Sequence, residues 1–224
     1  MSGGGRTVDR DLFLTRVGKA AMTARLPDPP NVGSDLPTLE PVELVALFRE
    51  RAQKVDAVVH GPMSGHGVPK AVVGIASGHQ ARTFMSWDTL PAAGVVSALA
   101  SAGMDRVSHD VPHEGRTEHQ MGYYHLDLGV TGADAGLAES GSIVVSHGEG
   151  RPRMASLAPR VHVAILDIGL MHRTLAHWVE QHPELVGETA NLVVITGPSR
   201  TGDIEQQLNL GVHGPRSVHL VLIK

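Results

Sequence analysis

The sequence predicts an α/β fold whose open, mostly parallel sheet is covered by helices. From residue 40 onward, short apolar runs alternate with segments of helical length, which is the pattern of strands and helices interleaved along one chain. An apolar fraction of 42% in 224 residues is enough for one sizeable core. The 26 Gly and 14 Pro indicate many tight connections between the elements.

The N-terminal part of the chain predicts a helical appendage. Residues 9–25 carry Leu12 and Val17 near helical spacing, with basic residues between them. The stretch "LPDPPNVGSDLP" then ends this helix, because its prolines and glycine favour an irregular connection. We therefore expect an N-terminal helix with a Pro-rich connection over 1–39, followed by an α/β domain over 40–224.

Within the α/β domain, the apolar runs predict the strands and the longer segments predict the helices. Helices are expected around 40–54, in "PAAGVVSALASAG" and from about 169 to 181. Strands are expected, in chain order, in "DAVVH", "AVVGIA", "YYHLDLGV", "GSIVVSH", "PRVHVAIL", "NLVVITG" and "SVHLVLI". We expect the middle of the domain to contain antiparallel neighbours.

Composition argues against several classes of function. The net charge of −4 gives no general attraction to phosphate backbones or anionic lipid, and three Phe, two Trp and two Tyr leave little material for stacking bases. Without Cys, the chain has no disulfide or zinc-thiolate site and cannot ligate an all-cysteine iron–sulfur cluster. No apolar run reaches the ~20 residues of a membrane span and no signal-peptide pattern is present, so a cytoplasmic protein is expected.

The stretch "NLVVITGPSRTGDIEQQLNLGVHGPRSVHLVLI" predicts a strand, a polar turn, a helix and a final strand. Backbone N–H groups at the start of that helix, beside Arg200, suit a phosphate or a carboxylate. The alternative is internal capping of the same N–H groups by Ser199, Thr201 or Asp203. His213, in the turn before the last strand, either faces the same cleft or holds a backbone carbonyl.

A polar, Gly-rich segment, "TGADAGLAESGSIVVS", runs into another predicted strand. Glu139 is a candidate carboxylate base there, since residues at a strand entrance can face a cleft. In the alternative reading, Asp134 caps a short helix "AGLAE" and Gly141 provides a required turn. The following loop, "HGEGRPRMASLAPR", presents Arg151 and Arg153 either as a cation pair for an anionic ligand or as solvated side chains.

Four histidines fall in the segment from His109 to His125 together with acidic residues, which is the chemistry of a metal site. They lack the H-E-x-x-H order, and no single helix or strand would bring the four imidazoles together. The sequence therefore favours a polar loop over metal ligation. The chain also lacks the G-x-G-x-x-G dinucleotide motif, the G-x-x-x-x-G-K-[ST] phosphate loop and, at Ser156, the G-x-S-x-G elbow of serine hydrolases.

In order and spacing, "GADAGLAESGSIVVS", "RMASLAPRVHVAIL" and "ITGPSRTGDIEQQLNLGVHGPRSVHLVLI" resemble the LUD domain of the lactate utilization protein C family. The resemblance covers about residues 130–224 and is looser before them. It implies an α/β fold similar to the sugar-phosphate isomerase and CoA-transferase group. It also implies a part in the oxidation of L-lactate to pyruvate beside two iron–sulfur partner proteins, with which a chain without Cys is compatible.

Several residues of the family pattern can be structural, and the pattern falls here on Asp134, Glu139, Gly141, Arg153, Ser156, Gly197, Pro198, Ser199, Arg200, Asp203, Glu205, Gly211, His213, Gly214 and Pro215. Glu139 is the candidate catalytic residue. The candidate ligand-binding residues are Gly197, Ser199, Arg200, Thr201, Arg153 and His213. The polar turn is expected to border a cleft at the carboxyl ends of the strands, where open α/β sheets bind ligands. The chain departs from the family at Ser140 and Ser142, where the family more often has Thr, and in its more charged glycine loop.

The leading hypothesis is an accessory or regulatory component of L-lactate oxidation that acts with iron–sulfur proteins and binds a small anionic ligand. No flavin, nicotinamide or cluster motif is recognisable, so no cofactor is expected in this chain. The alternative is a stand-alone enzyme acting on a phosphorylated or CoA-linked metabolite, with Glu139 as base or nucleophile and Arg200 holding the anion. A third hypothesis is an interaction protein that holds the partner subunits together.

Overall fold

The structure is a computed structural model, which describes residues 9–23, 37, 39–110, 123–183, 189, 191–201, 209–211 and 213–224. The chain forms two compact units, residues 1–34 and 35–224. The first contains α1, Arg10–Thr23, which begins where the Asp9 carboxylate accepts the backbone N–H groups of Asp11 (3.0 Å) and Leu12 (3.3 Å). The predicted N-terminal helix is thus confirmed. All other elements belong to the second unit.

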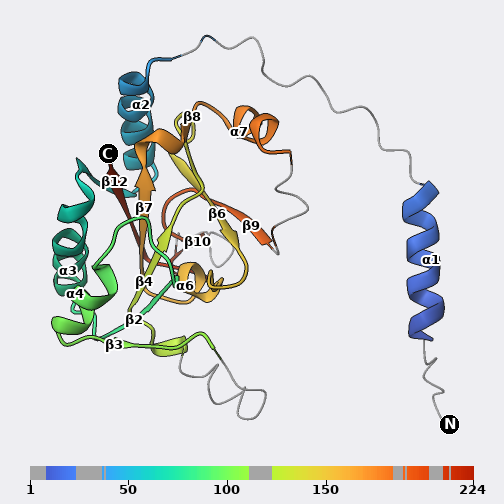
Figure 1. Cartoon of the computed structure of the whole chain (residues 1–224), viewed down its shortest axis with the longest axis horizontal. Coiled ribbons are helices and arrows are strands. Elements are labelled where there is room, and N and C mark those ends of the chain that lie inside the picture. The colour runs from blue at the N-terminus through green and yellow to red at the C-terminus, as the bar shows by residue number, and fades with distance from the viewer. Residues whose placement is uncertain are drawn as a thin grey trace. The chain divides into compact units, whose positions relative to one another are not determined.

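A six-stranded parallel sheet forms the centre of the second unit (Figure 1). Its strands lie in the order β1-β12-β7-β4-β2-β3, and every adjacent pair is parallel. The strands are β1 Val58–Met63, β2 Thr83–Ser86, β3 Asp105–Arg106, β4 Leu128–Gly132, β7 Val161–Asp167 and β12 Ser217–Ile223. The inner strands β4, β7 and β12 are almost entirely buried, as expected of parallel strands covered on both faces. The predicted open parallel sheet is confirmed.

Helices cover one face of this sheet (Figure 1). They are α3, Val68–Gly78, and α4, Val95–Ser101, whose buried residues pack against apolar side chains of β4, β7 and β12. The opposite face packs against α2, Pro41–Lys54, and the short helix α6, Met154–Leu157. Helix α2 begins with a capping box in which the Glu40 N–H donates to the Glu43 carboxylate at 2.9 Å.

A second sheet of four strands completes the cover of that opposite face. Its order is β8-β5-β6-β9, with β6 antiparallel to both neighbours and β5 parallel to β8. The strands are β5 Ala135–Leu137, β6 Ser142–His147, β8 Met171–His172 and β9 Asn191–Ile195. Ile143 and Val145 of β6 join the core beneath the parallel sheet, while Val144 packs on the other side with Trp178 of α7, Leu175–Gln181. The expected antiparallel neighbours are therefore present.

Short elements connect these layers. They are the 3₁₀ turns Gly65–Gly67, Tyr123–His125 and Ile168–Leu170, and the antiparallel pair β10 Arg200–Thr201 and β11 Asn209–Leu210. No helix among the described residues combines the length and apolar character needed to cross a bilayer. The helix predicted after Gly197 falls largely on residues outside the described ranges.

Two predicted elements and one alternative reading were wrong. "AVVGIA" belongs to α3, because its buried residues Val72, Ile75 and Ala76 extend the helical spacing that begins at Val68. The β-branched run suggested a strand, whereas the true strand is the next short apolar run, β2. The segment "AGLAE" contains β5 rather than a helix capped by Asp134. The helix expected from about 169 begins only with α7, after a 3₁₀ turn and β8.

Candidate functional site

The topology of the parallel sheet marks one place for a ligand. From β2 the chain moves outward to β3 at the sheet edge, and from β4 it moves the other way to β7, so the connections diverge between β2 and β4. In open α/β sheets a crevice forms at the carboxyl ends of strands where the connections diverge in this way. A cavity of about 650 Å³ lies at these strand ends, lined by residues 87–91 after β2 and 132–134 at the end of β4.

The wall of this cavity is held by Trp87, Arg151 and Asp134. The guanidinium of Arg151 lies 4.6 Å from the centre of the buried Trp87 ring and donates to Asp134 Oδ1 at 2.7 Å. It also donates to Ser146 Oγ at 2.9 Å, while Asp134 Oδ2 accepts the Ser146 N–H at 2.6 Å. Asp134 and Arg151 are paired with each other. Their role is therefore to form the cavity wall and to fix the turn at 148–151, and neither needs a ligand as a partner.

That turn also positions Asp88, the second residue after β2. The Asp88 N–H donates to the Gly150 carbonyl at 2.9 Å. Gly150 has φ +67, and a Cβ at this position would lie 3.2 Å from Asp88 Oδ2. Glycine therefore allows both the left-handed backbone of the turn and its close approach to the carboxylate.

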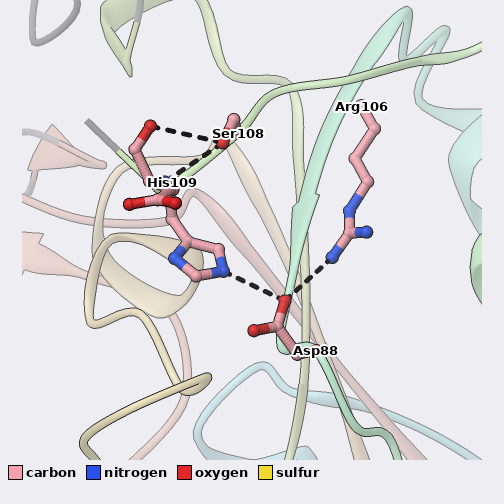
Figure 2. Close-up of polar contacts among 5 residues, drawn as sticks. Asp88, Arg106, Ser108 and His109 are labelled. Atoms are coloured by element: carbon pink, nitrogen blue, oxygen red, sulfur yellow. Dashed lines mark hydrogen bonds and ion pairs between the residues drawn. The ribbon is translucent and has the colours of Figure 1, made fainter. Parts of the chain in front are cut away.

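Asp88 is the centre of a polar cluster with Arg106 and His109 (Figure 2). Asp88 Oδ1 accepts hydrogen bonds from His109 Nε2 at 3.0 Å and from Arg106 Nη2 at 3.2 Å. The hydrogen bond from His109 is the main cause that lowers the pKa of Asp88 from its ordinary value, and the charge of Arg106 adds to it. The carboxylate is thus ionised at neutral pH and orients the imidazole.

The same three residues line a second cleft of about 270 Å³, together with Ser108 and Asp110. Asp88 also lines the larger cavity, so it lies between the two spaces. The strand β3 supplies Arg106, and the residues directly after it supply Ser108 and His109. An imidazole that an ionised carboxylate orients can perform acid–base work, and the guanidinium beside it can bind the carboxylate of a ligand.

The candidate catalytic residue Glu139 lies elsewhere, after β5 in the second sheet. Its Oε1 accepts from Arg173 Nε at 2.7 Å, and the pair lines a third cavity of about 390 Å³ with Ser140 and Ser142. None of these residues lines the cavity at the ends of β2 and β4. The alternative reading of Gly141 holds, since it has φ +67 in the turn after Glu139. A catalytic role for Glu139 stays a prediction.

The polar turn at Gly197–Arg200 lies at the opposite end of the sheet from the expected one. The Ser199 N–H donates to the Pro215 carbonyl at 2.9 Å, just before β12 begins, and Arg200 forms an ion pair with Asp56, just before β1 begins. A Cβ on Gly197 would lie 2.1 Å from the Val55 carbonyl oxygen. The turn thus borders the amino ends of β1 and β12, because the strand that precedes it, β9, belongs to the second sheet and not to the parallel one.

The other candidate ligand residues are spread over the second unit. Arg153 is exposed at the start of α6, where its carbonyl accepts from the Ser156 hydroxyl at 3.1 Å. His213 is exposed in the turn before β12. Thr201 lies in β10, with a side chain outside the described set, and Asp203 and Glu205 lie outside the described residues altogether. Ligand binding by Gly197, Ser199, Arg200, Thr201, Arg153 and His213 stays a prediction.

The sequence analysis missed the cluster around Asp88. His109 was noted only as one of four histidines for a metal, of which His113 and His119 lie outside the described residues. Within the described ranges, no group of three or more His, Cys, Asp or Glu side chains is arranged to hold a metal ion. The available signal was an Asp two residues after the short strand "TFMS", but assigning the strand to "AVVGIA" concealed it.

Comparison with known proteins agrees with this architecture. Residues 45–223 match the family model of the LUD domain. An uncharacterized protein of Neisseria meningitidis serogroup B is 32% identical over 129 residues, which make up 57% of this chain and 54% of that protein. Lactate utilization protein C of Halalkalibacterium halodurans is 40% identical over 101 residues, 43% of this chain and 44% of that protein. The chain spans about half the length of the curated relatives it matches.

A crystal structure of a DUF162 family protein from Deinococcus radiodurans superposes with a TM-score of 0.60. The superposition covers 84% of this chain and 100% of that chain, at 20% sequence identity. At this identity the likeness concerns the arrangement of helices and strands alone.

Proposed function

The chain belongs to the LUD domain family, and on this premise we propose that it takes part in lactate utilization by binding a small metabolite in the crevice after β2 and β4. The cavity of about 650 Å³ at the diverging strand ends is the observation that carries this proposal. Relatives from several bacteria bear the name lactate utilization protein C, which supports the pathway.

We further propose that the protein acts beside iron–sulfur partner proteins, in an accessory or regulatory role. Oxidation of a hydroxy acid needs an electron acceptor, and a chain without Cys cannot supply the thiolates of a cluster. The redox group would therefore sit on a partner, and this chain would contribute the metabolite site.

A growth assay tests both the role in lactate utilization and the crevice as the binding site. A strain lacking this gene is complemented with wild type, with Thr89→Trp, or with Gln53→Trp, and grown on L-lactate as sole carbon source. Thr89 is exposed and lines the cavity, so a Trp there fills ligand space without entering the core, whereas Gln53 is exposed on α2 away from the cavity. We expect wild type and Gln53→Trp to restore growth and Thr89→Trp to fail.

Normal growth of the deletion strain, with no second copy of the gene, would refute a role in lactate utilization. Full complementation by Thr89→Trp would instead refute the crevice as the site. For the partner proposal, affinity-tagged protein is purified from lactate-grown cells and assayed for bound iron and acid-labile sulfide. Absence of both would contradict a stable complex with iron–sulfur proteins.

A further inference from the structure

We propose that the protein forms a homodimer in which strand β9 of one copy pairs with β9 of a second copy, antiparallel, across a two-fold axis at Val193. Two observations carry this inference: β9 is an unprotected edge of the second sheet, and an apolar surface lies beside that edge. The dimer contact is separate from the crevice after β2 and β4, so the inference does not rest on the proposed function.

Strand β9 ends the second sheet. The order β8-β5-β6-β9 gives it one neighbour, β6, so its other backbone edge has no strand beside it among the described residues. Its sequence, "NLVVI", contains neither a charge nor a proline, the features with which proteins commonly protect an edge from pairing. An unprotected edge offers its N–H and C=O groups to a strand of another chain.

The outer face of the second sheet is apolar beside this edge. Val194 of β9 lies opposite Val144 of β6, and helix α7 covers Val144 with Trp178. The cover does not extend over the edge strand, because Val194 remains 39% exposed and Leu192, on the same face, 37% exposed. Two large apolar side chains of β9 are therefore left in contact with water.

Helix α7 adds two more exposed apolar side chains to this face (Figure 1). Leu175 and Val179 lie one turn apart on α7, and Leu175 lines the cavity of about 390 Å³ that Val194 also lines. The α7–β9 surface thus consists of Leu175, Val179, Leu192 and Val194. An extended peptide would pair with β9 but leave α7 exposed, whereas a second copy brings a helix together with its strand and covers both.

The charges beside the α7–β9 surface do not oppose contact between two copies. The charged residues that line the cavity are Glu139 and Arg173, which form an ion pair at 2.7 Å and so neutralise each other. The whole chain carries a net charge of −4, which makes two copies repel each other where their charges meet. A surface that is apolar and locally neutral suits a copy of itself better than a strongly charged partner.

A two-fold axis at Val193 matches the two strands residue by residue. Directly opposite residues of an antiparallel pair lie on the same face, so Leu192 of each copy faces Val194 of the other. These two contacts cover the exposed side chains of β9 and place them between the two α7 helices. The interface is isologous, since both copies use the same surface, and it closes after two chains.

Cysteine cross-linking tests the axis, because the chain has no Cys of its own. Val193→Cys places two sulfurs opposite each other, where the Cα atoms of an antiparallel pair lie about 4.5–5.5 Å apart, within the range of a disulfide. Val194→Cys is the matched control, since it faces position 192 of the other copy. We expect oxidised Val193→Cys to run as a dimer on non-reducing gels and Val194→Cys, although more exposed, to remain largely monomeric.

Light scattering during size-exclusion chromatography measures the dimer itself. The double variant Leu192→Lys/Val194→Lys places like charges opposite each other twice and should raise the dimer Kd about tenfold or more. Leu192→Lys/Val194→Glu places opposite charges across the axis and should dimerise at least about tenfold more tightly than the first variant. Val42→Lys, at an apolar position on α2 that is 75% exposed, should leave the dimer unchanged.

A wild-type protein that is monomeric up to about 100 μM would overturn the inference and leave the α7–β9 surface to a different protein. A dimer that persists unchanged in Leu192→Lys/Val194→Lys, shown by circular dichroism to be folded, would place the contact elsewhere. Cross-linking of Val194→Cys in preference to Val193→Cys, or equal weakening by the two double variants, would reject the axis at Val193. None of these outcomes bears on the growth test of the crevice.

Discussion

The central carbon of the Arg151 guanidinium lies over the indole of Trp87, 4.6 Å from the ring centre. The same guanidinium forms an ion pair with Asp134, which follows β4, while Trp87 follows β2. One side chain thus joins the ends of the two strands between which the crevice opens. The contacts of Arg151 with Trp87 and Asp134 therefore stabilise the fold and also form the wall of the cavity.

We predict that Arg151→Ala lowers the free energy of unfolding by about 1–3 kcal/mol. The change leaves Asp134, which is largely buried, with only its bond from Ser146 and removes the cation from the Trp87 ring. Urea unfolding followed by tryptophan fluorescence measures it, and Arg82→Ala, at an exposed position, is the control. Equal stability of the two variants would show that the wall contributes nothing.

Gly141 and Gly103 offer a matched pair for the cost of a side chain at positive φ. Both have left-handed backbone, at φ +67 and +83, but a Cβ on Gly141 would lie 2.2 Å from the Ala52 nitrogen, whereas nothing lies within 4 Å of one on Gly103. We expect Gly103→Ala to cost about 1–2 kcal/mol from backbone strain alone, and Gly141→Ala about 2–5 kcal/mol because overpacking adds to it. Thermal unfolding in parallel provides the comparison. Similar losses in both variants would mean that α2 shifts freely away from the turn.

Much of the fold follows from local pattern. The buried strands β7 and β12 are apolar runs interrupted by one histidine each, a pattern typical of strands covered on both faces, and α2 carries its capping box in the sequence. "AVVGIA" was misread because β-branched residues occur in both kinds of element and a six-residue window cannot separate a period of 2 from one of 3.6. Local pattern could not predict that the strands divide into two sheets, since the sequence of β9 does not indicate which sheet it joins.

The site was harder to predict than the fold for the same reason. Asp88, Arg106 and His109 come from two strand ends that become neighbours only through the parallel pairing of β2 with β3. The turn at Gly197 is conspicuous in the sequence, but its place at the amino ends of β1 and β12 depends on which sheet β9 joins. A motif identifies a turn, whereas strand order decides which end of the sheet the turn occupies.

Buried histidines should make the protein less stable in mild acid. Burial is the main cause that lowers the pKa of His162 to about 3 and that of His219 to about 4, from 6.5. Above pH 6.5 both states hold neutral histidines. Below it the unfolded chain binds protons that the folded chain does not, so stability is lost as the pH falls from 6.5 toward 4.

At pH 5.5 each such histidine costs on the order of 1 kcal/mol relative to pH 7.5, or about 2–3 kcal/mol for the two together. Urea unfolding at both pH values measures the loss. His162→Gln, which keeps an amide near the Thr131 hydroxyl, should reduce the loss by about 1 kcal/mol, while the exposed His66→Gln should not change it. An unaltered pH dependence in folded His162→Gln would contradict the assignment.

Substitution of Arg200 tests whether the ligand binds at the polar turn or in the crevice. Its guanidinium is engaged by Asp56 in a largely exposed ion pair, so Arg200→Ala should change the free energy of unfolding by less than about 1 kcal/mol. The turn lies at the amino ends of β1 and β12, away from the diverging strands, and we therefore expect Arg200→Ala to restore growth of a deletion strain on L-lactate. Asp88→Asn should fail in the same assay, because a neutral amide no longer holds Arg106 and His109 together. The reverse result, with both variants folded, would place ligand binding at the turn and exclude the crevice.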